Sequence, residues 1–170
     1  MTENDERFVI RPAEEPDLED IAAIYRQHVY GGDATSDFVA QPPTYWAARM
    51  QSTVSGDHIL VAHPEGGGRI VGYAYSAPFR PRPAYRFTRE TSVYLSAQAA
   101  GKGLGTRLYE SLLDRLRKDE MHTAIALITM PNPGSEKLHL KMGFEKIGVM
   151  KEAGKELGEW RDAGWFQLML

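Results

Sequence analysis

The stretch Gln98-Ala99-Ala100-Gly101-Lys102-Gly103-Leu104-Gly105-Thr106 decides the fold of this chain. A β-like run over residues 91–96 leads into it, and a helical pattern leaves it, with a leucine at every fourth residue from Leu104 to Leu116. Its three glycines therefore lie at a predicted strand-to-helix turn. Glycine has no Cβ atom, so the amides of such a turn can point together at an anion. The helix N-terminus adds unpaired donors, and the expected ligand is a phosphate or pyrophosphate.

Three patterns compete for this glycine stretch. A nucleotide-binding P-loop requires Gly-Lys-Ser/Thr after four spaced residues, which Gly101-Lys102-Gly103 does not supply. A dinucleotide-binding fingerprint requires G-x-G-x-x-G, whereas the spacing here is G-x-G-x-G. The third pattern, Q-x-x-G-x-G, is met in full by Gln98, Gly101 and Gly103. A glycine-rich turn that binds nothing remains the alternative.

Length and composition indicate one domain over residues 1–170, with the composition of an ordinary globular protein. The net charge of −3 gives no reason to expect nucleic acid or an anionic membrane as a partner. The chain has no cysteine, which excludes disulfides, thiolate metal sites and a cysteine acyl-enzyme. The polar N-terminus carries no apolar signal segment, and no apolar run is long enough to span a bilayer. We therefore expect a cytoplasmic protein.

The predicted order of elements is β-α-α-β-β-β-α-β-α-β-β. The predicted strands cover residues 8–11, 58–62, 69–77, 88–96, 123–129, 144–151 and 159–170, and the predicted helices cover 17–31, 44–54, 104–116 and 133–142. Residues 123–129 are apolar on both faces, which is typical of a strand in parallel pairing. A right-handed βαβ unit is therefore predicted around the third helix.

The last predicted helix has a clear beginning and end. Asn132 is predicted as its N-cap, with Pro133 at the first helical position. Leu138 and Met142 are predicted to form its buried face, and Gly143 to end it.

The element order and the Q-x-x-G-x-G loop resemble the GNAT superfamily of N-acetyltransferases, and the chain resembles its phosphinothricin N-acetyltransferase branch more closely still. The matching segments are Ala84-Tyr85, residues 88–96, Gly103-Leu104-Gly105, Leu108-Tyr109, residues 131–135, His139, Leu140-Lys141-Met142-Gly143-Phe144 and residues 158–162. The resemblance implies the GNAT fold, an α/β (α+β) architecture with a mixed central sheet and four helices. It also implies acetyl-CoA as co-substrate, no metal, and a homodimer. The implied acceptor is the α-amino group of phosphinothricin, methionine sulfoximine or methionine sulfone.

The same resemblance assigns the coenzyme site. Backbone amides around the three loop glycines would hold the pyrophosphate, with Lys102 as charge support. Amides near Tyr94 and Leu95 would bond the pantetheine arm and the thioester oxygen, and Asn132 would bond the arm. The full predicted set is Val93, Tyr94, Leu95, Gln98, Gly101, Lys102, Gly103, Gly105, Thr106, Asn132 and Ser135. For Asn132, a helix cap and nothing more is the alternative.

Glu90 is the predicted general base. An α-amino group titrates near ~8, so at pH 7 it is mostly protonated and cannot attack. A carboxylate with a raised pKa in a partly desolvated cleft can take that proton. Glu90, Ser92 and Tyr94 share one face of their strand. The alternative for Glu90 is a solvated side chain at a strand edge.

His139 is predicted to protonate the leaving thiolate. Many GNAT enzymes carry a tyrosine at this position of the last helix, whereas the phosphinothricin branch carries histidine. Imidazole can donate a proton near neutral pH. A packing histidine is the alternative. The other four histidines have no metal-ligand spacing, so no metal site is predicted.

The acceptor is expected to contact Phe38, Arg80, Arg82 and Tyr85, together with Glu90. A planar guanidinium can pair two donors with a carboxylate or phosphinate. Prolines on either side of Arg82 would stiffen this loop. The alternative is a solvated basic loop or a dimer contact. Residues 34–43 depart from the family pattern, because Phe38 is displaced from the position at which the family carries a phenylalanine.

The sequence therefore predicts an acetyl-CoA-dependent N-acetyltransferase that acts by direct transfer on the α-amine of a small amino-acid analogue. One alternative is an enzyme that acetylates a protein N-terminus, a lysine or a polyamine. A polyamine pocket would need acidic residues. The arginine-rich segment 80–86 is evidence against such a pocket. The other alternative is a non-catalytic module that binds acetyl-CoA.

Overall fold

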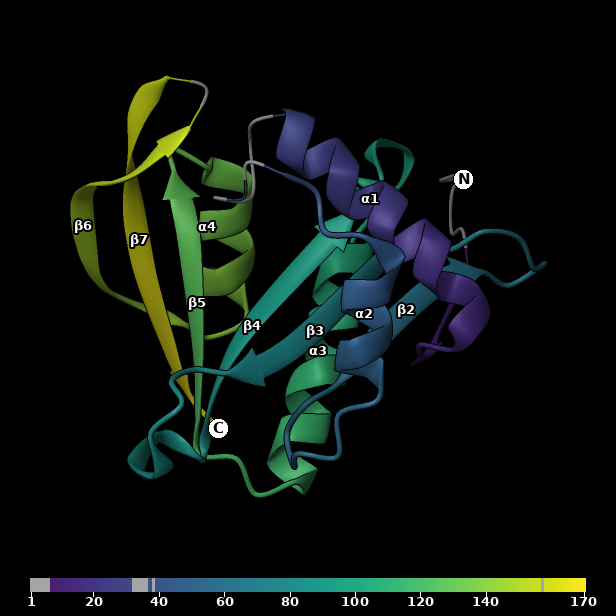
Figure 1. Ribbon diagram of the computed structural model, residues 1–170, viewed down its shortest axis with the longest axis horizontal. Helices are drawn as coiled ribbons and strands as arrows, with labels where there is room; N and C mark the ends of the chain where they lie inside the picture. The colour runs from purple at the N-terminus through teal and green to yellow at the C-terminus, as the bar shows by residue number, and fades with distance from the viewer. Residues whose placement is uncertain (1–6, 32–36, 38, 157) are drawn as a thin grey trace, which may run out of the picture.

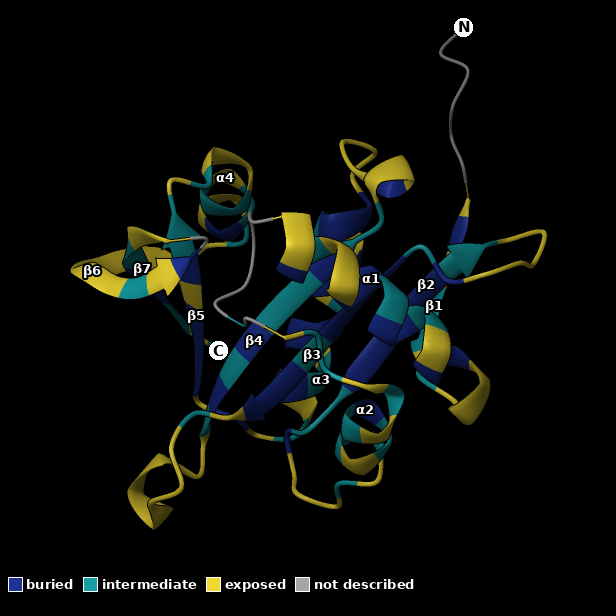
Figure 2. Cartoon of the chain, turned by 45° about the horizontal axis from the view of Figure 1, so that its top comes forward, coloured by how far each residue is buried: buried dark blue, intermediate teal, exposed yellow. Residues whose placement is uncertain are grey.

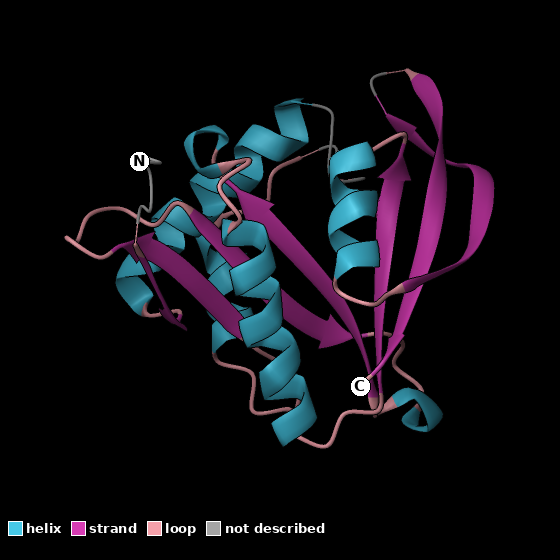
Figure 3. Cartoon of the chain, turned by 180° about the vertical axis from the view of Figure 1, so that it is seen from behind, coloured by secondary structure: helices cyan, strands magenta, loops and turns pink. Residues whose placement is uncertain are grey.

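A computed structural model describes residues 7–31, 37, 39–156 and 158–170. Within these residues, seven strands form one sheet in the order β1-β2-β3-β4-β5-β7-β6. The strands are β1 (Phe8–Pro12), β2 (Ile59–Pro64), β3 (Gly72–Pro78), β4 (Thr88–Leu95), β5 (Thr123–Met130), β6 (Glu145–Glu156) and β7 (Glu159–Met169). The α-helices are α1 (Leu18–Gly31), α2 (Pro43–Met50), α3 (Leu104–Lys118) and α4 (Pro133–Lys141). Helices α1 and α2 lie on one face of the sheet, and α3 and α4 on the other (Figures 1 and 3).

The structure confirms the predicted fold class and element order. Strands β4 and β5, which precede and follow α3 in the sequence, pair in parallel, as the predicted βαβ unit requires. The other neighbouring strands pair antiparallel. None of the described helices is long and apolar enough to cross a membrane.

Before β4, two element ends differ from the predictions by three residues or more. Helix α2 ends at Met50 instead of residue 54, and the chain then turns through Gly56 at φ +86°. Strand β3 begins at Gly72 instead of residue 69, because Gly67 and Gly68 extend the preceding turn at positive φ. The second difference comes from glycines whose backbone leaves the regular region, whereas α2 ends at its C-cap Gln51, well before Gly56.

The last hairpin also differs from the prediction, and α4 adds one buried residue to it. Strand β6 runs on to Glu156, through Gly154, because an irregularity after Met150 with Glu152 at φ +51° lets pairing with β7 resume. In α4, Leu138 and Met142 are half-buried and pack against the core, as predicted, and the one fully buried side chain of this helix is His139.

The hydrophobic core lies on both faces of the sheet. The leucines of α3 at residues 104, 108, 112 and 116 are all fully buried, as their spacing predicts. Each contributes roughly 1.5–3 kcal/mol relative to an exposed position. On the other face, α1 and α2 cover a cluster of aromatic side chains that includes Trp46, Tyr73 and Tyr94.

The sheet divides at its centre. Strands β4 and β5 pair only from Thr88 to Glu90, opposite Thr123 to Ile125. Beyond this point β4 stays paired with β3 as far as Leu95, while β5 stays paired with β7 as far as Met130. The two strands therefore diverge (Figure 1). This divergence positions the candidate site.

Candidate active site

A cleft of about 320 Å³ lies between the diverging ends of β4 and β5. Its walls come from both strands, from the glycine loop and from the N-terminal half of α4. It brings together the predicted site residues Val93, Tyr94, Leu95, Gly101, Asn132, Ser135 and His139. These residues are separated in the sequence, and the divergence of the two strands makes the space that they share.

The glycine loop presents its backbone to open space. Gly101 and Gly103 have φ of +77° and +76°, a conformation that favours glycine. A Cβ atom built on either residue would meet nothing within 4 Å. Gly103 is the N-cap of α3, and no side chain caps that helix end. The first amides of α3 are therefore arranged as in an anion-binding helix N-terminus.

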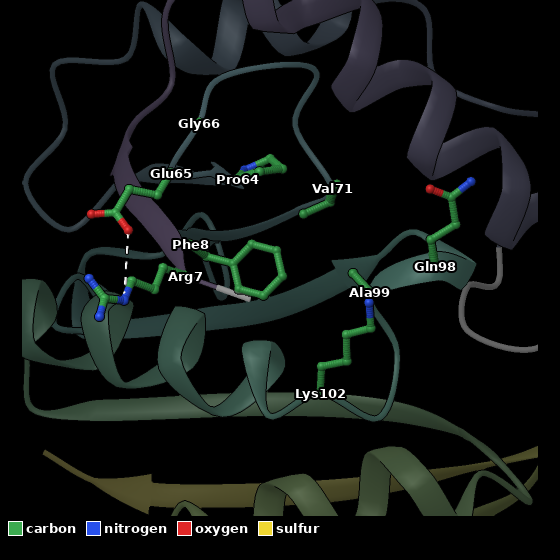
Figure 4. Close-up of a pocket in the computed structure, with 9 residues that line it drawn as sticks. All are labelled: Arg7, Phe8, Pro64, Glu65, Gly66, Val71, Gln98, Ala99 and Lys102. Atoms are coloured by element: carbon green, nitrogen blue, oxygen red, sulfur yellow. Dashed lines mark ion pairs between the residues drawn. The ribbon is translucent and has the colours of Figure 1, made fainter. Parts of the chain in front are cut away.

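The side chains of the loop point elsewhere. Gln98 and Lys102 line a separate hollow of about 490 Å³, together with Phe8 and Val71 (Figure 4). They are not among the residues that line the cleft. Thr106 lies in the first turn of α3, where its hydroxyl accepts a hydrogen bond of 3.5 Å from Lys141. Any coenzyme contact in this loop is thus expected from the backbone.

A chain of buried hydrogen bonds runs beside the cleft. The hydroxyls of Thr91 and Tyr109 lie 2.6 Å apart, and the Tyr109 hydroxyl lies 3.0 Å from Nε2 of His139. Nδ1 of His139 lies 2.7 Å from the carbonyl oxygen of Ser135. Because a carbonyl only accepts, Nδ1 carries the proton and Nε2 accepts from Tyr109. Both ring nitrogens of His139 therefore have protein partners.

Burial fixes the charge state of this chain of hydrogen bonds. It lowers the pKa of His139, against the opposing effect of the bond to the Ser135 carbonyl. It also raises the pKa of the Tyr109 hydroxyl far above its ordinary value, although Thr91 donates to that oxygen. At neutral pH, His139 is therefore an uncharged imidazole.

Glu90 faces a smaller cavity of about 90 Å³. Its lining residues are Arg49, Tyr75, Ala77, Pro78, Glu90 and Ser92. Burial raises the pKa of Glu90, and the positive charges of Arg80 and Arg49 oppose this rise. Ser92 lines both this cavity and the larger cleft, so the two spaces adjoin at that side chain. The sequence analysis assigned no role to Arg49, which no motif marks.

The proposed acceptor loop contributes less to these cavities than predicted. The guanidinium of Arg80 donates to the carbonyl oxygen of Phe79 at 2.8 Å and lies 4.4 Å from the centre of the Phe79 ring. Arg82 and Tyr85 are exposed and line neither the cleft nor the Glu90 cavity. Phe38 lies outside the described residues.

The sequence profile of the acetyltransferase (GNAT) family matches residues 19–144. The chain belongs to the GNAT acetyltransferase family. The match begins in α1 and ends just after α4, so it includes the cleft and the glycine loop.

Individual proteins resemble this GNAT acetyltransferase along nearly its whole length. A phosphinothricin N-acetyltransferase of Streptomyces coelicolor is 33% identical, over 93% of this chain and 94% of that protein. An L-methionine sulfoximine/L-methionine sulfone acetyltransferase of Pseudomonas paraeruginosa is 36% identical, over 95% of this chain and 94% of that protein. Among solved structures, a phosphinothricin acetyltransferase of Sinorhizobium meliloti in complex with acetyl-CoA has a TM-score of 0.89 and is 39% identical. That match covers 96% of this chain and 88% of the other.

This GNAT acetyltransferase is an acetyl-CoA-dependent N-acetyltransferase. Its glycine loop fits the coenzyme, because the space above Gly101 and Gly103 lets a ligand approach the backbone closely. Among the described residues, no group of three or more histidine, aspartate or glutamate side chains is placed to hold a metal ion.

Proposed function

We propose that the enzyme transfers the acetyl group of acetyl-CoA directly to the α-amine of a small amino-acid analogue of the phosphinothricin, methionine sulfoximine or methionine sulfone class. The observation that carries this proposal is the adjacency of two spaces, since the Glu90 cavity and the larger cleft share Ser92. One space suits the acceptor amine and the other suits the thioester. The names of the relatives support the acceptor class.

Glu90 is proposed to act as the general base. Its carboxylate takes a proton from the ammonium group of the acceptor, and the freed lone pair attacks the thioester carbon. The nitrogen of the resulting adduct loses its second proton as the carbon–sulfur bond breaks, an amide forms, and coenzyme A leaves as its thiolate, which takes up a proton. The raised pKa of Glu90 supports this role, because it brings the carboxylate closer to the pKa of the amine.

The chain would hold the coenzyme mainly by its backbone. We assign the pyrophosphate to the amides around Gly101, Gly103 and Gly105, and the arm to Val93, Tyr94 and Leu95. Asn132 and Ser135 would complete the arm site from α4, as part of the cleft wall. For Gln98, Lys102 and Thr106 we propose contacts with the coenzyme only through their backbone or at the edge of the cleft. Their side chains are outside the cleft lining.

His139 is proposed to return a proton to the leaving thiolate. The uncharged imidazole cannot give up its Nδ1 proton without becoming an imidazolate, so this role requires His139 first to take up a proton at Nε2, where Tyr109 now donates. Replacement of His139 with Gln should slow turnover if this role holds. Unchanged turnover would leave His139 a packing residue and would assign the proton to water.

The Glu90→Gln variant tests the proposed function. We expect turnover to fall by about 10²–10⁴-fold, the usual contribution of a general base. Calorimetric affinity for acetyl-CoA should stay near that of the wild type. Glu110→Gln, on the exposed surface of α3, is the matched control. Unchanged turnover of Glu90→Gln would exclude Glu90 as base.

A panel of acceptors tests the substrate class. Release of free coenzyme A is measured with methionine sulfone, phosphinothricin, a polyamine and a lysine-containing peptide. We expect release with the first two acceptors. Release only with the polyamine or the peptide would favour the alternative enzyme, and no release with tight acetyl-CoA binding would favour a non-catalytic module.

A homodimer is also proposed, with an uncovered sheet face as its interface. On the side opposite α4, strand register places Leu127, Met150 and Met169 on one face of β5, β6 and β7, and all three are exposed. Figure 2 shows that much of β6 is exposed. A second copy of the chain would bury them. Sedimentation of the wild type and of Met150→Glu tests this, and a dimer that persists in the variant would exclude this face.

A further inference from the structure

One positively charged side chain lines the Glu90 cavity and has no ion-pair partner among the described residues. Arg49 lies in the last turn of α2, and its guanidinium carbon is 5.0 Å from the centre of the Tyr45 ring and 5.2 Å from that of Tyr75. The two rings hold the guanidinium in place without neutralising its charge.

Within the part of the chain that the structure describes, Arg49 forms no hydrogen bond through its side chain. Its Nε atom is buried and has no hydrogen-bond partner among the described residues. Across the same residues, no carboxylate forms an ion pair with its guanidinium. The Nε atom is closed off from the cavity, whereas the two Nη atoms are not among the buried atoms and form no hydrogen bond with the described residues, so they are the donors that a ligand in the cavity can meet.

The other arginines near Glu90 are placed differently. Arg80 is exposed, and its guanidinium donates to the carbonyl oxygen of Phe79. Arg82 is exposed on the same loop. Of the residues that line the Glu90 cavity, Arg49 is the one that carries a positive charge. A guanidinium and a carboxylate therefore face one small space.

We propose that Arg49 binds the carboxylate of the acceptor through its two Nη–H groups, and so places the α-amine against Glu90. This inference rests on the proposed function and names the group that selects its acceptor. An α-amino acid carries its amine and its carboxylate on one carbon, so a base and a guanidinium in one cavity match both groups. The planar guanidinium pairs two donors with two carboxylate oxygens, which lysine cannot do.

The Arg49→Lys variant tests this inference, since it keeps the charge and removes the paired donors. KM is measured for L-methionine sulfone and for its carboxamide, which has the same amine and no carboxylate. We expect the KM for the acid to rise about tenfold or more, equivalent to the loss of one good charged contact. The KM values for the carboxamide and for acetyl-CoA should not change. Arg117→Lys, on the exposed surface of α3, is the control.

Several outcomes would overturn the inference. An unchanged KM for the acid would do so and leave the proposed function intact, as would an equal rise for acid and carboxamide. If the wild type acetylates neither compound, the proposed function fails, and calorimetric binding of L-methionine sulfone then decides the role of Arg49. Binding that is lost only in Arg49→Lys supports the inference, whereas equal binding by both proteins, or binding by neither, overturns it.

Discussion

The Tyr109 hydroxyl donates a hydrogen bond of 3.0 Å to Nε2 of His139, which joins α3 to α4 through the core. The two rings also meet edge to face, with centroids 5.1 Å apart. The same hydroxyl accepts from Thr91 on β4. One tyrosine thus connects the strand at the cleft with both helices behind it, and it fixes which nitrogen of His139 carries the proton.

Replacing Tyr109 with Phe should therefore destabilise the protein. The change leaves Nε2 of His139 buried without a donor, at a cost of about 1–3 kcal/mol. Urea denaturation measures this loss. Tyr85→Phe, which removes an exposed hydroxyl, provides the control. If Tyr109→Phe unfolds at the wild-type urea concentration, the hydrogen bond to His139 contributes nothing to stability.

The Glu90→Gln variant should gain stability relative to the wild type as the pH rises. Burial raises the folded-state pKa of Glu90 above its unfolded value of about 4.3. The favourable contribution of Glu90 is thus complete below that value and is lost as the pH rises through the folded-state pKa. Glutamine does not titrate, so the difference in unfolding free energy between variant and wild type should increase between about pH 4 and pH 7. A flat difference over this range would mean that Glu90 is as well solvated in the folded as in the unfolded chain.

Asn132→Ser should separate the two roles of this residue. The Asn132 side chain accepts from the amide of Ser135 at 3.1 Å and so caps α4. Serine caps about as well as asparagine, so stability should stay within about 0.5 kcal/mol of the wild type. Serine has no amide donor for the coenzyme, and we expect the KM for acetyl-CoA to rise. Unchanged KM with unchanged stability would assign Asn132 to helix capping alone.

Gly101→Ala should weaken acetyl-CoA binding. Gly101 has φ of +77°, and an alanine in that conformation costs roughly 1–2 kcal/mol. The loop can escape this strain only by rotating its amides, which would remove them from the pyrophosphate. Gly66→Ala is the control, since its φ is not in the positive range and its Cβ position is open. Calorimetry gives both affinities, and equal values for the two variants would argue against the loop as the anion site.

Local patterns in the sequence predicted much of the fold. The leucine spacing of α3, the glycine turn before it and the Asn132 cap each depend on residues within a few positions of one another, and the structure confirms all three. The positive φ of Glu152 was not predictable in the same way, because no residue type marks it. The extension of β6 through Gly154 therefore escaped the prediction.

Part of the cleft lining was predictable from the sequence. The sequence placed Val93 and Gly101 in one coenzyme site, and both line the cleft. It could not place Arg49, because the contact of α2 with Tyr75 joins segments that only the folded sheet brings together. It also could not show that Gln98 points into a separate hollow, since that direction follows from the 3₁₀ turn at Ala97–Ala99.

The early divergence of β4 from β5 interrupts the ladder of hydrogen bonds between them. A sheet normally lacks a neighbouring strand only at its rims, whereas here the side of β4 that faces β5 also lacks strand pairing between Glu90 and Leu95. This stretch lies between the layers of helices (Figures 1 and 3). An extended ligand with its own carbonyl and amide groups can complete the interrupted ladder. Saturation with acetyl-CoA should therefore slow hydrogen exchange at the amides of residues 91–95 more than at those of the outer strands.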